Sequence, residues 1–173
     1  MSGSGRPRPA PRVGAESGGP RRLVIGVGNP DRGDDAAGRL VARGLRERSS
    51  GTISVRECSG EATALMEAWS GFDDVLLVDA CRGAGAPGSV HRLEADQLER
   101  LGLWQRHRQE STHSFGVSAA IALARALGTL PSRVVVYAIE AAHFRDAAGL
   151  SPEVRAAVEK TVALLASGED DRG

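Results

Sequence analysis

Short apolar runs alternate along the chain with longer stretches in which apolar residues recur every three or four positions. The runs at 22–28, 74–80 and 132–140 contain few polar side chains, which is typical of strands buried on both faces of a parallel sheet. Shorter strands are predicted at about 52–57 and 90–93. The chain therefore alternates strands with helices, as in an α/β protein.

Four helices are predicted between these strands. The first presents one apolar face made by Ala36, Ala37, Leu40, Val41 and Leu45, the second covers about 62–69, and the third covers about 115–127 and ends at Gly128. The last begins at Pro152, where Ser151 can cap it and Glu153 favours its positive end. Its buried face is formed by Val154, Val158, Thr161, Val162 and Leu165.

These elements predict a single three-layer α/β/α domain at residues 22–167, with a mostly parallel, mixed central sheet. Residues 1–21 consist mainly of Pro, Gly, Ser and Arg and are expected to be disordered, and 168–173 are expected to be flexible. The 22 basic residues balance the 22 acidic ones, which indicates neither nucleic-acid nor membrane binding. No apolar run is long enough to cross a bilayer, and two cysteines without a CxxC pair suit the cytoplasm.

The loop GVGNPDRGDDAAG at 26–38 resembles a phosphate-binding turn but has the wrong charge. A dinucleotide fingerprint requires a third glycine where Asp31 stands, and the P-loop signature Gly-Lys-Ser/Thr is absent. Asp34 and Asp35 would repel a phosphate and attract a cation. One of them suffices to cap the following helix, so the second indicates another role.

Two further polar residues stand at junctions of the predicted elements. Asp79 closes the apolar run VLLVD, and His113 lies directly before the helix predicted at 115. Each has a simple structural alternative, as the start of a loop or as a neighbour of a helix cap. Right-handed crossovers bring such junctions to one edge of a sheet, where two carboxylates and an imidazole suit nickel, zinc or iron. From the residues alone, a metal site and a purely structural role both remain open.

Several motifs resemble those of the hydrogenase maturation protease family, which trims the large subunit of nickel–iron hydrogenases. The family pattern GxGNxxxxDDxxG is matched at 26–38, its strand-ending VDA at 78–80, and its TH before a helix at 112–113. Its late IEP…GLSPEV segment is matched at 139–140 and 149–154, although Ala141 replaces the usual proline. The resemblance extends over about 22–167 and implies a phosphorylase/hydrolase-like fold.

The resemblance also implies a function. The chain would be an endopeptidase that removes the C-terminal extension of the large-subunit precursor after nickel insertion, acting as a cytoplasmic monomer. The residues that contact the metal and support catalysis would be Asp35, Asp79 and His113, with the nickel supplied by the substrate. Gly60 and Glu140 would bind substrate at the rim of the cleft. The chain lacks GxSxG and HExxH, and Cys81 has no context that would make it a nucleophile.

Two other functions remain alternatives. The segment GVGNPD is similar to the GLGNPG of peptidyl-tRNA hydrolases, but the chain lacks a basic surface signature for tRNA. A non-enzymatic nickel-binding chaperone could share the same fold, because fold does not fix function. Among the other histidines, His91 is expected to be a solvated strand residue, and His143 could reach the cleft from the end of the last strand.

Overall fold

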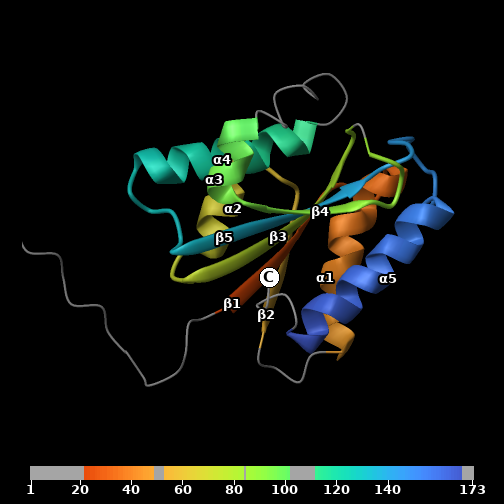
Figure 1. The fold of residues 1–173 in the computed structure, drawn as a ribbon, viewed down its shortest axis with the longest axis horizontal. Coiled ribbons are helices and arrows are strands. Elements are labelled where there is room, and N and C mark those ends of the chain that lie inside the picture. The colour runs from red at the N-terminus through yellow and green to blue at the C-terminus, as the bar shows by residue number, and fades with distance from the viewer. Residues whose placement is uncertain (1–21, 49–52, 84, 102–111, 169–173) are drawn as a thin grey trace, which may run out of the picture.

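The computed structural model describes residues 22–48, 53–83, 85–101 and 112–168, with the side chains of 99–101 and 112–115 excepted. The predicted disorder of 1–21 and the flexibility of 169–173 lie outside this range. A five-stranded sheet forms the centre of the molecule (Figure 1). Its strands are β1 (Arg22–Val27), β2 (Ser54–Cys58), β3 (Asp74–Cys81), β4 (Val90–Glu94) and β5 (Arg133–Glu140).

The strands are ordered β2-β1-β3-β5-β4 across the sheet. The pairs β1–β2, β1–β3 and β3–β5 are parallel, and β4 runs antiparallel to β5. All eight residues of β3 are buried, because helices cover both faces of the central strands. The predicted mostly parallel, mixed sheet is therefore confirmed.

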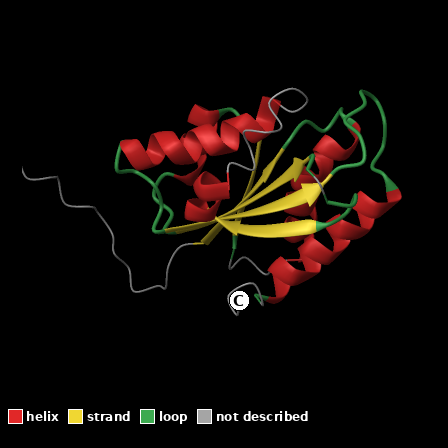
Figure 2. Cartoon of the chain, turned by 45° about the horizontal axis from the view of Figure 1, so that its top comes forward, coloured by secondary structure: helices red, strands yellow, loops and turns green. Residues whose placement is uncertain are grey.

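Helices cover both faces of this sheet (Figures 1 and 2). On one face, α1 (Ala37–Arg48) and α5 (Pro152–Ser167) share an apolar core with the central strands. On the other face, α2 (Ala62–Trp69), α3 (Ala95–Leu101) and α4 (Thr112–Ala126) do the same. The three-layer prediction is thus correct. No described helix combines the length and apolar character that a membrane span requires.

Three local predictions need correction. Helix α3 was not predicted, because its seven residues are too few to display a helical period. Helix α4 was predicted to begin at about Phe115, whereas it begins at Thr112 and includes His113 in its first turn. A 3-10 turn, η1 (Gly33–Ala36), precedes α1 and carries both Asp34 and Asp35.

The strand order defines where a ligand would bind. The chain moves outward from β1 to β2 and then returns to β3 on the opposite side of β1. In open α/β sheets, ligands bind at the carboxyl ends of the strands where the order reverses in this way. The loop after β1 carries Asp35, and the end of β3 carries Asp79.

Candidate active site

Three glycines bring the backbones of β1, α1 and β3 into direct contact. A side-chain carbon at Gly28, whose φ is +135°, would overlap the carbonyl oxygen of Asp35. One at Gly38 would overlap carbonyl oxygens of both Val27 and Val78, and one at Gly26 would overlap that of Gly38. The glycines of the GxGNxxxxDDxxG motif therefore set η1 and α1 against the end of β3, rather than surrounding a phosphate.

Asp34 fixes a distant loop. Its buried carboxylate accepts hydrogen bonds from the N–H groups of Ala142 (2.8 Å), His143 (3.1 Å) and Ser151 (2.7 Å), and from the Ser151 hydroxyl (3.1 Å). Asp34 and Asp35 lie inside η1, whose N-cap position is Arg32, so neither aspartate occupies the N-cap position considered for it. Ser151 does occupy the N-cap position of α5, but its hydroxyl binds Asp34 instead of capping the helix.

Asp35 points to the other side of the same turn, toward β3. The residue is 1 % exposed, and its Oδ2 accepts a hydrogen bond from the Asn29 N–H at 3.2 Å. The Asn29 side chain in turn accepts one from the Asp31 N–H at 3.0 Å. Asn29 thus shapes the loop with its N–H and its side chain, and the positive φ belongs to Gly28.

Asp79 is fully buried at the carboxyl end of β3. Among the described residues, neither of its carboxylate oxygens accepts a hydrogen bond. Burial, and next the negative charge of Asp35, raise the pKa of Asp79 from 3.8 to about 8. The neighbouring Ala80 N–H opposes this only in part, because it does not have hydrogen-bond geometry with the carboxylate. Two carboxylates thus lie close enough to repel each other at one point of the sheet edge.

The structure places the backbone of His113 but not its imidazole. The first turns of α4 rest on the loop after β2, where a side-chain carbon at Gly116 would overlap the carbonyl oxygen of Gly60. Gly60 itself has a φ of +89°. The described side chains contain no group of three or more His, Cys, Asp or Glu residues placed to hold a metal ion. The structure therefore brings Asp35 and Asp79 close together, whereas a metal contact from His113 remains a prediction.

Glu140 binds its own chain. Its buried carboxylate accepts hydrogen bonds from the N–H groups of Gly83 (2.6 Å) and Gly85 (3.4 Å), and it lies 3.0 Å from Nε2 of His91. His91 is largely exposed, as expected, but its contact with Glu140 was not predicted from the sequence. The carboxylate therefore secures the turn that follows β3, and its role in substrate binding stays a prediction.

Two other residues bear on the predicted chemistry. His143 packs against Gly33 of η1 and is held through its backbone by Asp34, with its Nδ1 buried.

Burial and the negative charges of Glu140 and Asp79 raise the pKa of the Cys81 thiol strongly. A thiol that stays protonated is a poor nucleophile, in agreement with the absence of a cysteine-protease motif.

Comparisons with known proteins point to one family. The family model described as hydrogenase maturation protease (HycI) matches residues 51–167, which is more than half of the chain. No curated protein matches the sequence. Similar solved structures include the Escherichia coli hydrogenase maturating endopeptidase HybD, with 22 % identity, a TM-score of 0.74, and coverage of 88 % of this chain and 94 % of that one.

Two structures from Thermococcus kodakarensis are also similar. The [NiFe] hydrogenase maturation protease HycI is 27 % identical, with a TM-score of 0.67 and coverage of 86 % of this chain and 92 % of that one. HybD from the same organism is 25 % identical, with a TM-score of 0.67 and coverage of 84 % and 96 %. The family match sets aside the peptidyl-tRNA hydrolase and chaperone alternatives. The chain belongs to the hydrogenase maturation protease family, the endopeptidases of hydrogenase maturation.

Proposed function

We propose that this endopeptidase removes the C-terminal extension from the large-subunit precursor of a nickel–iron hydrogenase after nickel has been inserted. Asp35, Asp79 and His113 would contact that nickel, and the protein would act as a monomer in the cytoplasm. The observation that carries the proposal is Asp79, which is fully buried beside a second carboxylate and accepts no hydrogen bond from the described residues.

The surroundings of Asp79 suit a cation. Burying a charged carboxylate without hydrogen bonds destabilises the folded protein, and a second negative charge beside it destabilises it further. A divalent ion bound between the two carboxylates would offset both the lost hydration and the repulsion. Carboxylate and imidazole ligands are compatible with nickel, and the backbone of His113 stands at the same end of the sheet.

Residues of the chain itself orient the two carboxylates before any metal binds. The Asn29 N–H orients the Asp35 carboxylate, and the fully buried β3 fixes Asp79. Nickel bound there would supply the positive charge that docks the precursor. Two carboxylates and one imidazole leave coordination positions open, so a free ion would be held loosely, whereas nickel already held by the substrate would complete its shell. Purified protein is accordingly expected to carry little tightly bound metal.

The test is incubation with nickel-loaded and nickel-free precursor, followed by gel mobility of the large subunit. The wild type is expected to cleave only the loaded form. Asp35→Asn, Asp79→Asn and His113→Ala are each expected to lower the rate at least about 100-fold, because each removes a direct metal contact. Glu159→Gln, at an exposed carboxylate of α5, is the matched control and should retain full activity. Equal cleavage of both precursors would refute the nickel requirement.

A further inference from the structure

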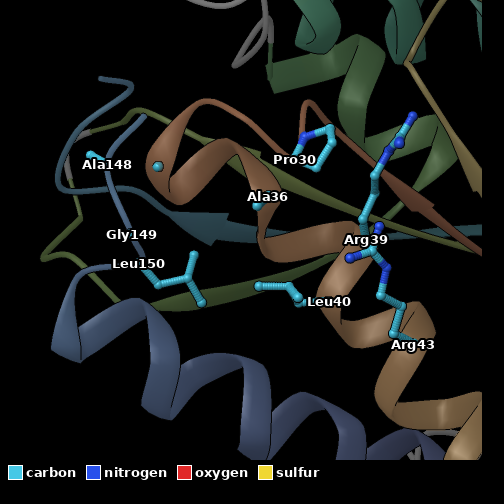
Figure 3. Close-up of a pocket in the computed structure, with 9 residues that line it drawn as sticks. Pro30, Ala36, Arg39, Leu40, Arg43, Ala148, Gly149 and Leu150 are labelled. Atoms are coloured by element: carbon cyan, nitrogen blue, oxygen red, sulfur yellow. The ribbon is translucent and has the colours of Figure 1, made fainter. Parts of the chain in front are cut away.

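A groove lies beside the candidate active site, between α1 and the loop at 148–150 (Figure 3). Its volume is about 140 Å³, and much of its lining is apolar, from Pro30, Ala36, Leu40 and Leu150. Arg39 and Arg43 stand together at one end, away from Leu150 (Figure 3). The groove thus combines an apolar half with a basic end.

The groove shares a wall with the turn that carries Asp35. Gly33 and Ala36 of η1 line the groove, whereas Asp35, between them in sequence, is buried outside its lining and close enough to Asp79 of β3 for the two charges to repel. The opposite wall is the loop that Asp34 fixes through its hydrogen bonds to Ala142, His143 and Ser151. Both walls are therefore held in place by buried contacts, and the groove is pre-formed next to the site.

The basic end has more positive than negative charge. Arg43 and Arg46 both pair with Glu57, at 3.1 and 2.6 Å. Arg39 donates through Nε to the carbonyl oxygen of Cys58 at 3.4 Å, and no carboxylate in the described part of the chain forms an ion pair with it. Arg43 and Arg46 thus share the carboxylate of Glu57, and Arg39 adds a positive charge that no described carboxylate balances, which leaves this end complementary to an anion. Arginine is well suited to bind a carboxylate with two parallel hydrogen bonds.

We propose that this groove binds an acidic segment of the precursor polypeptide. An apolar side chain of that segment packs against Leu40 and Leu150, and a neighbouring Asp or Glu side chain binds Arg39 and Arg43. The identity of the partner rests on the proposed function, because the precursor cleaved at Asp35 and Asp79 is the polypeptide brought next to this groove, which shares the turn that carries Asp35. The charge of the occupant follows from the groove alone.

Charge reversal at Arg39 tests the proposal in two assays. The first is steady-state processing of nickel-loaded precursor. The second is fluorescence anisotropy of labelled nickel-free precursor, which lacks the nickel contact, so that its weaker binding reports on other contacts such as those in the groove. Arg39→Glu is expected to raise KM at least tenfold, with most of the loss in KM rather than kcat, and to weaken binding in the anisotropy assay by the same factor. Wild-type binding should weaken as salt is raised, and binding by the variant should depend on salt less.

Arg125→Glu is the matched control, since this exposed arginine lies on α4, on the other face of the sheet. It should leave KM and the binding constant from anisotropy within twofold of the wild type.

Arg39→Gln, which keeps a polar side chain, provides a second variant if charge reversal lowers the melting temperature. If no precursor is cleaved by the wild type, the proposed function fails while the anisotropy still tests the groove. A KM and a binding constant within twofold of wild type in both Arg39 variants, or an equal loss in Arg125→Glu, would overturn the proposal.

Discussion

Asp34 and Asp79 are both buried near the end of β1, but their surroundings differ in the number of hydrogen-bond donors. The carboxylate of Asp34 accepts four hydrogen bonds. The carboxylate of Asp79 accepts none from the described residues and lies beside Asp35. At the residue scale, one aspartate therefore stabilises the fold, and the other is held there at the expense of stability, as is common for functional groups.

Asp79→Asn is expected to make the metal-free protein more stable above neutral pH. The folded-state pKa of Asp79 is about 8 against 3.8 for an ordinary aspartate, so folding takes up a proton between these values. The free energy of unfolding of the wild type should therefore fall as the pH rises from 4 to 8 and level off above it. At pH 8 the variant should gain at least about 1 kcal/mol, and less than the roughly 6 kcal/mol that the full shift from 3.8 to about 8 represents.

Urea unfolding between pH 5 and 9, with a chelator present, measures this difference. Asp34→Ala provides the contrast, because it leaves four donors without their acceptor. It should lower the free energy of unfolding by about 3 kcal/mol, in line with the loss of hydrogen bonds to a buried charged group. If Asp79→Asn were destabilising across this pH range, the account of the site would be wrong.

At the scale of elements, the glycines control how closely α1 approaches the sheet. Gly38→Ala should lower the free energy of unfolding by at least about 2 kcal/mol, although alanine is normally the better helix former. The reason is that the added carbon would overlap backbone oxygens of Val27 and Val78, which cannot move without shifting β1 or β3. Urea unfolding measures this loss of stability. The same substitution should also increase the distance between the carboxylates of Asp35 and Asp79.

Gly149→Ala is the matched control for this change. A side-chain carbon there would have no atom within 4 Å, and Gly149 is not among the glycines with positive φ. The substitution should leave stability unchanged or raise it by up to about 1 kcal/mol, because alanine restricts the unfolded chain. Equal losses in the two variants would show that the close approach of α1 is not the cause.

At the scale of the whole molecule, the domain is expected to be stable without its first 20 residues. Deleting 1–20 should change the melting temperature by less than about 2 °C, since that segment has few apolar side chains to bury. Deleting 1–24 should prevent folding, because it removes the buried Leu23 and Val24 and the ion pair from Arg22 to Asp74 at 2.7 Å. Circular dichroism melting and precursor processing check both deletions, and a clear loss on removing 1–20 alone would mean that the segment docks on the domain.

The sequence by itself determined most of the architecture. The buried strands were predicted to within about two residues, because a strand covered on both faces must be almost wholly apolar. The proximity of Asp35 and Asp79 also followed from the sequence, since right-handed crossovers bring the ends of β1 and β3 to one edge. Short elements were less predictable, and α3 and the first turn of α4 lack a clear helical period.

Only the tertiary structure decided which of the adjacent aspartates serves the fold. Asp34 and Asp35 are equivalent in the sequence, and the difference arises from backbone N–H groups more than one hundred residues away. Glu140 is similar, because its donors are backbone groups of Gly83 and Gly85. Every residue except proline has such an N–H group, so these partners leave no mark on the amino-acid pattern. Their positions depend on how distant segments pack, and that packing also creates the groove between α1 and the 148–150 loop.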